Sequence, residues 1–381
     1  MIKDVLLLVN NIRDRYYIKK NFKKYKDSNL ISSFDYTRCI NYLKAQEKLL
    51  PEYIFSKSSK RNSLYSGTYA CLLQGMYIGY TENERRKWIE YFDNHQREDG
   101  LFVDKNYDDR NFFSENGGWG AEHLVPHILV AYDRLQAIPK YELKYLKKYE
   151  IYNTKDNWLE KLDYRNIWGS SNHIMNRVVA MQYARDRLRM DFSESIQTIE
   201  EILLEKINPE YGMWFDGKAN DINSRNEMIR GMYHILPIFY YDNIKTPFAS
   251  RAIDQIVLSQ NKWGGFDKNI GSSACADIDG LDPLLRLWVQ ENGYQYTSDI
   301  KEVVDRAKEW IIFNQNQDGG FVFERNKKFK YGNQVSLTSE KDESNLFATW
   351  FRCLSLELIE DFFSQNSHSR LIKTVGYECP L

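Results

Sequence analysis

Three aspartates lie within six residues of one another: Asp277, Asp279 and Asp282. When like charges lie this close together in a cavity, repulsion and partial desolvation raise the pKa of one carboxyl group. A carboxylic acid with a raised pKa can donate a proton near neutral pH. Asp282 directly precedes Pro283, which favours an N-cap role for this residue, but one cap needs only one acid. We therefore predict an acid site here, with Asp277, Asp279 and Asp282 as catalytic candidates.

Polar and aromatic side chains gather in four other short stretches of the chain. Glu122 supplies a further catalytic candidate, because it could form with Asp279 the carboxylate pair that glycoside-cleaving enzymes use. Tryptophan rings offer platforms for sugar faces, and they could equally stabilise a carbocation. Asn345 could instead cap a helix. The residues that we expect to bind a substrate are Trp119, His123, Trp168, Asn172, His173, Asn226, Arg230 and Asn345.

A repeat runs through the chain and indicates how these residues are positioned. Each copy has an amide residue, three others, a glycine, one further residue and an aromatic ring. The four clear copies span residues 96–102, 208–214, 260–266 and 315–321. Their spacing gives a period of 52 to 56 residues, with a degenerate copy expected near residues 156–168. The chain is therefore built from one structural unit that is used about six times.

Apolar residues on both sides of each copy recur at helical spacing, for example Val303 and Ala307 before the fourth copy. The glycine supplies the positive φ angle that ends a helix, and the amide can satisfy carbonyl groups there. Two helices per unit form a hairpin, and six hairpins can close into a ring. We predict an all-α (α/α)6 toroid over residues 61–381, preceded by a helical extension over residues 1–60. The candidate residues then lie where the inner helices begin, around a central cavity.

The repeat resembles the Gln-x-x-x-Gly-x-Phe/Trp motif of the squalene-cyclase and prenyltransferase superfamily, over residues 65–360. This resemblance implies an (α/α)6 toroid in which the motif ties the outer ends of helices together. Asp277-Ile278-Asp279-Gly280 also resembles the Asp-x-Asp-Asp motif of class II terpene cyclases, whose middle acid protonates an alkene or epoxide. The resemblance gives Asp279 the role of proton donor, with Gly280 in place of the last acid.

These observations lead to one leading hypothesis and two alternatives. The first is a terpenoid-cyclase-like enzyme, an isomerase that protonates an isoprenoid substrate in a central aromatic cavity. The second is a carbohydrate-active hydrolase or lyase that uses a carboxylate pair on a glycan. The third is a toroid that binds a peptide or glycan without turning it over, because a fold does not determine a function. We expect no cofactor and no bound metal ion in any of the three.

Composition and charge narrow the range of partners. The chain of 381 residues carries 52 Lys and Arg against 53 Asp and Glu, and its net charge of -1 disfavours binding to nucleic acid.

The apolar run of residues 5–9 is too short for a signal peptide or a transmembrane segment. The five cysteines form no Cys-x-x-Cys pair, and the order Cys275-x-Asp277 differs from the zinc site of the protein prenyltransferases. We expect a cytoplasmic protein, whose lysines in residues 19–26 could support peripheral contact with a membrane surface.

Overall fold

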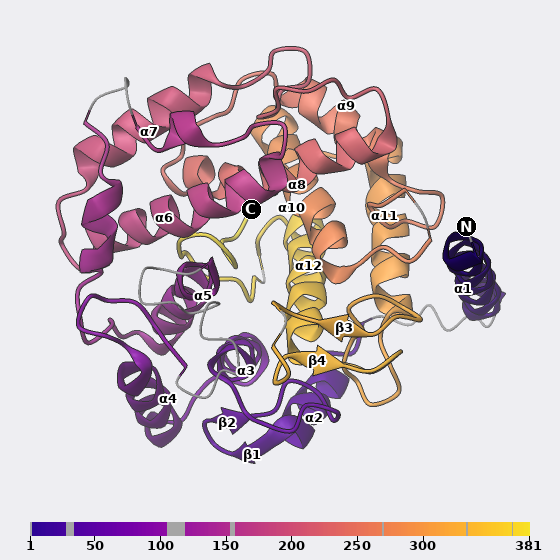
Figure 1. Ribbon diagram of the computed structural model, residues 1–381, viewed down its shortest axis with the longest axis horizontal. Coiled ribbons are helices and arrows are strands. Elements are labelled where there is room, and N and C mark those ends of the chain that lie inside the picture. The colour runs from indigo at the N-terminus through magenta and orange to yellow at the C-terminus, as the bar shows by residue number, and fades with distance from the viewer. Residues whose placement is uncertain are drawn as a thin grey trace.

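The computed structural model is built mainly of helices (Figure 1). It describes residues 2–27, 34–104, 119–152, 157–268, 270–332, 334–367 and 369–381, with side chains from residue 12 onward and without that of Trp119. Within these residues the strands form two short antiparallel hairpins, β1 (Glu47–Leu49) with β2 (Glu52–Tyr53) and β3 (Phe329–Lys330) with β4 (Thr338–Ser339). The predicted all-α class is confirmed.

Six helices contact one another in a ring at the centre of the molecule. They follow each other in the chain, each contacts the next, and the last, α12, contacts the first, α3. Their bounds are α3 (Leu64–Tyr77), α5 (Trp119–Leu135), α6 (Ile167–Arg187), α8 (Ile222–Tyr241), α10 (Ala274–Asn292) and α12 (Leu346–Ser364). Nearly every residue of α12 is buried, because other helices surround it. We interpret this ring as the inner layer of the predicted (α/α)6 toroid.

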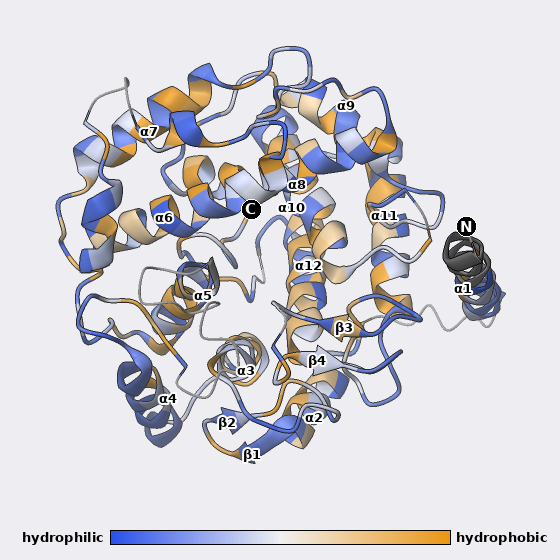
Figure 2. Cartoon of the chain, viewed as in Figure 1, coloured by the Kyte–Doolittle hydropathy of each residue, from blue (hydrophilic) through white to orange (hydrophobic). Residues whose placement is uncertain are grey.

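A second set of elements packs against the outside of the ring, and one of them precedes each inner helix. These outer elements are α2 (Tyr36–Gln46), α4 (Glu82–His95), the 3-10 helix η1 (Lys144–Tyr149), α7 (Ser193–Glu205), α9 (Ala249–Ser259) and α11 (Ser298–Phe313). In α4 only Trp88 and Phe92 are buried, so this helix has a single apolar stripe. Figure 2 shows the contrast between the hydrophilic α4 and the more hydrophobic α12. A short 3-10 helix, η2 (Leu159–Lys161), lies in the connection before α6.

The hydrophobic core extends into the N-terminal segment of the chain. Cys39 and Tyr42 of α2 share one core with the ring helices. The first helix, α1 (Ile2–Asp27), lies at the edge of the molecule (Figure 1) and packs Phe22 against Trp310, with 5.7 Å between the ring centroids. The outer layer therefore starts before residue 60.

The four repeat glycines each join one outer element to the next. Gly264 has a φ angle of 101°, and the side chain of Gln260 donates to the carbonyl oxygens of Gly264 (3.1 Å) and of Val303 in α11 (2.8 Å). A Cβ atom on Gly264 would lie 2.0 Å from the carbonyl oxygen of Arg306, so only glycine fits here. The same two features, a positive φ and a backbone neighbour in the next outer segment, recur at Gly100, Gly212 and Gly319. The predicted positive φ of the repeat is confirmed.

The fourth copy closes the outer layer onto its beginning. A Cβ atom on Gly319, just after α11, would lie 2.0 Å from the carbonyl oxygen of Arg38 in α2. Arg38 in turn donates to Oε1 of Gln315 (3.3 Å) and to the carbonyl oxygen of Asn316 (2.8 Å). After the third outer element, η1, the described part of the degenerate copy near residues 156–168 contains η2 and the start of α6 instead of such a turn.

The C-terminal segment, residues 369–381, crosses one end of the ring, and the C-terminus lies among the helices in Figure 1. Tyr240, near the end of α8, donates to the carbonyl oxygen of Gly376 (2.8 Å). Arg286, in the second half of α10, donates to the carbonyl oxygen of Cys379 (2.6 Å). The segment therefore covers the end at which α8 and α10 finish.

We predict that Gly264→Ala destabilises the protein by at least about 3 kcal/mol, because it combines a strained φ angle with a backbone clash. Gly79→Ala is the matched control, since Gly79 also has a positive φ (81°) but nothing within 4 Å of its added Cβ. The control should lose only about 1–2 kcal/mol. Urea denaturation measures both free energies of unfolding, and equal losses would contradict the role assigned to the repeat glycine.

Candidate active site

The three clustered aspartates lie inside α10, and all three are buried. The helix begins at Ala274, and its N-cap is Ser273, whose side chain accepts a hydrogen bond from the backbone N–H of Ala276. Asp282 therefore lies well inside the helix, and its predicted N-cap role is wrong. Pro283 also lies inside the helix and not at its first turn.

Asp277 is held by two donors. Arg352 Nη1 donates to Asp277 Oδ2 at 2.5 Å, and Trp310 Nε1 donates to the same oxygen at 3.0 Å. Arg352 is fully buried and comes from α12, so the ion pair fixes α10 relative to α12. Burial raises the pKa of Asp277, and attraction to Arg352 opposes that rise. This geometry favours a positioning role for Asp277.

Asp282 forms a buried ion pair with Arg286 one turn later, with 2.7 Å between Oδ1 and Nε. Arg286 also donates to the carbonyl oxygens of Cys379 (2.6 Å) and Pro380 (2.9 Å). Burial raises the pKa of Asp282, whereas the charge of Arg286 lowers it. The pair therefore holds the C-terminal segment against α10.

Asp279 lies between these two ion pairs in the sequence of α10 and has no such partner among the described residues. Its side chain is 3% exposed, and its Oδ2 is buried without a hydrogen-bond partner there. Burial raises the pKa of Asp279 well above its ordinary value; the charge of Arg230 opposes the rise, and Asp277 and Asp282 add to it. The sequence suggests two causes for a raised pKa here, repulsion between the acids and desolvation. Desolvation is the larger of the two for Asp279. Burial therefore favours the protonated form of Asp279.

Aromatic rings from four parts of the chain meet inside the ring of helices. Tyr377 of the C-terminal segment stacks on His127 of α5 with 4.4 Å between ring centroids, and its ring lies 5.4 Å from that of Trp350 in α12. Tyr233 of α8 lies 6.4 Å from Tyr377. Burial raises the pKa of both tyrosines, and Asp279 in its ionised form would add to that rise. The acid therefore lies within electrostatic reach of an aromatic interior.

The histidines of this interior are neutral. Burial lowers the pKa of His127 and of His234 to about 3, and it lowers the pKa of His123 well below the ordinary value. His127 Nδ1 donates to the carbonyl oxygen of His123 (2.9 Å), so its Nε2 carries a lone pair, and that atom is buried without a partner among the described residues. His123 lies 3.0 Å and 3.1 Å from the hydroxyl oxygens of Tyr65 and Tyr331. The interior thus contains a neutral base, His127, beside the tyrosine that Asp279 influences.

Glu122 belongs to a separate network at the start of α5. Arg177 Nε lies 3.3 Å from one carboxylate oxygen, Lys148 Nζ lies 3.8 Å from the other, and the hydroxyl of Tyr149 also donates to Glu122. The guanidinium of Arg177 stacks on the ring of Tyr149 at 3.9 Å. Among the described residues, no hydrogen bond or ion pair joins Glu122 to Asp279. The two carboxylates expected to act as a pair therefore belong to different networks.

Five of the expected substrate-binding residues lie near the starts of the adjacent helices α6 and α8: Trp168, Asn172, His173, Asn226 and Arg230. The guanidinium of Arg230 lies 4.8 Å from the centroid of the Trp168 ring. Trp168 is 40% exposed. Asp267 joins the group, because it accepts from Arg230 at 3.2 Å and from Asn226 at 3.5 Å. Sequence reasoning missed Asp267, although it directly follows the Gly-Gly-Phe of the third repeat copy.

Asn345 is the N-cap of α12, as the capping alternative predicts. Its Oδ1 accepts from the backbone N–H of Ala348 (2.8 Å), and its Nδ2 donates to Ser339 Oγ (3.1 Å). The residue is fully buried, so both ends of its amide are occupied. The side chain of Trp119, also expected to bind a substrate, lies outside the described residues.

Steric crowding explains why glycine occupies position 280, where the Asp-x-Asp-Asp pattern has its last acid. A Cβ atom at this position would lie 2.3 Å from Cγ of Phe266, the aromatic residue of the third repeat copy. An aspartate at position 280 would therefore displace the ring that packs α10 against its own repeat loop.

A search among known proteins matched no family model and no curated protein. Within the described part of the chain, no three His, Cys, Asp or Glu side chains come together as a set that could hold a metal ion. The inference of function therefore rests on the geometry of α10 and the rings around it.

Asp282→Ala should destabilise the protein strongly, because it leaves the charge of Arg286 buried without a partner. Loss of one member of a buried pair costs about 3–5 kcal/mol. Glu302→Ala is the matched control: Glu302 is the exposed partner of Arg306, also four residues later, and its loss should cost less than about 0.5 kcal/mol. Urea denaturation at pH 7 measures both, and a loss below 1 kcal/mol on the ~5–15 kcal/mol scale of domain stability for Asp282→Ala would contradict the buried pair.

Asp279→Asn should remove a pH dependence of stability. Because the folded pKa of Asp279 is raised, the folded protein binds this proton more tightly than the unfolded chain, whose aspartates titrate near about 3.9. The stability of the parent protein therefore falls relative to Asp279→Asn as pH rises above about 4, by up to about 1.4 kcal/mol per pH unit until the folded pKa is passed. Urea denaturation of both proteins between pH 4.5 and 8 gives this difference, and a constant difference over the series would contradict a raised pKa.

Proposed function

We propose that the chain is a terpenoid-cyclase-like enzyme that starts its reaction by donating the proton of Asp279 to an isoprenoid alkene or epoxide. The observation that carries this proposal is the burial of the Asp279 carboxyl group with one oxygen unpartnered. A carboxylic acid in an apolar site stays protonated at neutral pH, and the absence of a competing hydrogen bond leaves its proton available to a substrate.

The surroundings of Asp279 support the steps that would follow protonation. A carbocation is stabilised by the faces of aromatic rings, and Tyr233, Trp350 and Tyr377 supply such faces. The reaction ends when a base removes a proton from the final cation. Nε2 of His127 is the buried lone pair that could accept it, and a pKa of about 3 suffices because carbocations are far stronger acids. His127 would then release its proton to solvent and Asp279 would take one up from solvent, with no metal or cofactor required.

A glycan-acting hydrolase or lyase is the second candidate, and the exposed ring of Trp168 beside Arg230 is the observation that favours it. This reaction needs two carboxylates with access to one bond. Glu122 would have to leave Arg177 and Tyr149 in order to serve with Asp279. A toroid that only binds its ligand remains as the third reading of the same residues.

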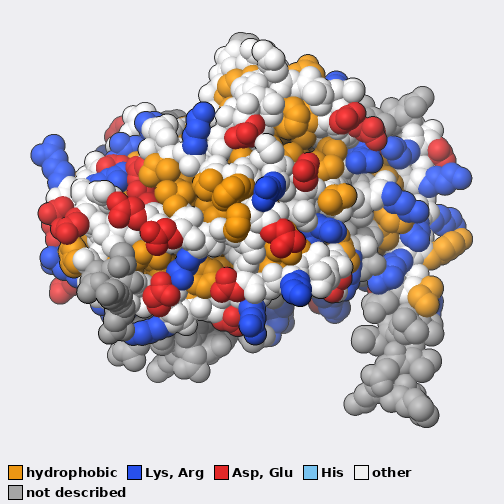
Figure 3. All heavy atoms as spheres, turned by 90° about the horizontal axis from the view of Figure 1, so that it is seen from above, with side chains coloured by type: hydrophobic (Ala, Val, Ile, Leu, Met, Phe, Trp, Pro, Cys, Tyr) orange, Lys and Arg blue, Asp and Glu red, His pale blue; other side chains and the backbone are white. Residues whose placement is uncertain are grey.

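We also propose a cytoplasmic location, which the five free cysteines favour. Among the described helices, none combines the length and apolar character that crossing a bilayer demands. Peripheral contact with an anionic membrane surface would use α1, whose exposed cations include Lys19, Lys20 and Lys23. Basic side chains gather at the end of the molecule that carries α1 (Figure 3).

The test is a substrate panel combined with two variants. The purified protein is incubated with squalene-type olefins, prenyl diphosphates and bacterial polysaccharides, and the products are analysed by mass spectrometry. We expect cyclised isomers of an isoprenoid, and Asp279→Asn should lower their rate of formation at least about 100-fold, with the melting temperature kept. Asp305→Asn, a change at an exposed aspartate of α11, is the control and should have no effect.

Glu122→Gln separates the two enzymatic candidates. A protonation-initiated cyclase should tolerate this change, whereas a glycosidase should lose nearly as much activity as it loses in Asp279→Asn. Full activity of folded Asp279→Asn on any substrate of the panel would overturn the proposed role of the acid.

A further inference from the structure

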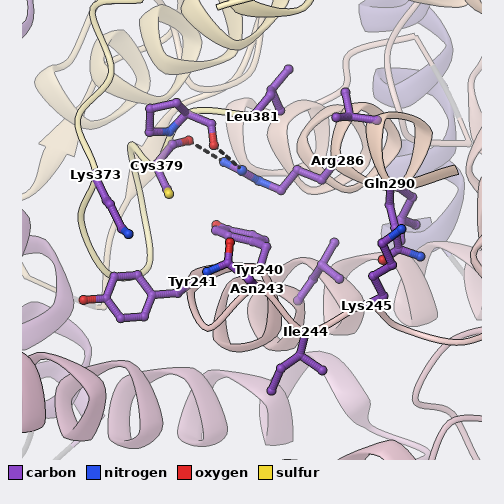
Figure 4. Close-up of a pocket in the computed structure, with 14 residues that line it drawn as sticks. Tyr240, Tyr241, Asn243, Ile244, Lys245, Arg286, Gln290, Lys373, Cys379 and Leu381 are labelled. Atoms are coloured by element: carbon purple, nitrogen blue, oxygen red, sulfur yellow. Dashed lines mark hydrogen bonds between the residues drawn. The ribbon is translucent and has the colours of Figure 1, made fainter. Parts of the chain in front are cut away.

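A cavity of about 500 Å³ lies between α8, the turn after it, α10 and the C-terminal segment (Figure 4). This volume falls within the range of small-molecule sites, about 300–1,000 Å³. The cavity is distinct from the candidate active site. Asp279 lies in the first half of α10, whereas Arg286, Val289 and Gln290 line the cavity from its second half.

The walls of the cavity are mostly apolar, and their polar groups are largely occupied. The apolar lining consists of Leu236, Ile244, Leu287, Val289, Pro380 and Leu381. Tyr240 donates its hydroxyl to the carbonyl oxygen of Gly376, and Gln290 exchanges hydrogen bonds with the backbone of Thr246 at 3.0 Å each. The polar wall groups are therefore fixed before any ligand binds, which lowers the entropic cost of binding.

The charged side chains of the lining are all basic. Arg286, Lys245 and Lys373 line the cavity, and its lining contains no acidic side chain. The charge of Arg286 is balanced by Asp282. Lys245 and Lys373 are exposed, and neither has an ion pair with a described residue. In Figure 4 the two ammonium groups lie on different sides of the cavity, one on the C-terminal segment and one after α8. An apolar cavity with two uncompensated cations at its edge favours an amphiphilic anion.

We propose that this cavity binds an amphiphilic anion, with its apolar chain between α8 and α10 and its carboxylate or phosphate at Lys245 or Lys373. Apolar burial supplies most of the affinity, and the lysines select for negative charge. The ligand would also contact Pro380 and Leu381, and thereby stabilise the C-terminal segment. This site does not depend on the reaction proposed above.

Calorimetric titration with three probes of equal chain length tests the proposal: dodecanoate, dodecyl phosphate and dodecanol, each below its micelle concentration. We expect both anions to bind at least tenfold more tightly than dodecanol. The tighter of the two anions identifies whether a carboxylate or a phosphate is preferred. Equal affinity for dodecanol and the anions, or no binding of any probe, would overturn the proposal.

Two variants locate the binding site. The double variant Lys245→Glu/Lys373→Glu should weaken the binding of dodecanoate at least tenfold. The matched control Lys48→Glu/Lys87→Glu reverses two exposed lysines that do not line the cavity and should leave the affinity unchanged. Val289→Trp fills the cavity from a half-buried position and should abolish binding of all probes while the melting temperature is kept. Unchanged binding in the double variant or in Val289→Trp would contradict the assigned site.

Discussion

The contact between each repeat glycine and the backbone of the next outer element is the constraint on which the ring depends. A side chain at Gly264 would collide with α11, and one at Gly319 would collide with α2, so the outer elements can approach this closely only through glycine. Each inner helix follows its outer element in the chain. The distance between neighbouring outer elements therefore determines where each inner helix begins. The positions of the inner helices in turn determine which side chains meet inside the ring.

Closure of the ring buries three aspartates of α10. Two of them form ion pairs with arginines, and this pairing explains why the third, Asp279, has no partner of its own among the described residues. Arg352 neutralises Asp277, and Arg286 neutralises Asp282. Asp279 lies between these two aspartates in the same helix, and the opposing cation that affects it, Arg230, is already engaged with Asp267. A buried carboxylate without a partner is costly, and protonation removes that cost. In the described part of the chain, the two ion pairs thus leave a third buried acid without a partner of its own, and its burial favours the protonated form.

The sequence predicts the architecture better than the site, and the reasons are physical. Helical spacing and the glycine turns follow local rules, so the all-α class and the positive φ angles could be predicted. The N-cap interpretation of Asp282 fails because Pro283 is tolerated inside α10, where it removes the helical hydrogen bond to the carbonyl of Asp279. Tyr377 lies outside the repeat and reaches His127 only through long-range packing, which no local pattern encodes.

The C-terminal segment decides from which end the interior can be reached. Its backbone is bound by Tyr240 and Arg286, and its Glu378 forms a buried ion pair with Arg134 of α5, so moving the segment away would break a buried ion pair. Opening that end of the ring is therefore energetically unfavourable. At the starts of α6 and α8, by contrast, the residues are partly exposed, and Arg230 extends from the surface beside Trp168 to within electrostatic reach of Asp279. The starts of α6 and α8 are therefore the more exposed end of the ring, and the cavity lined by Arg286 and Leu381 lies at the opposite end.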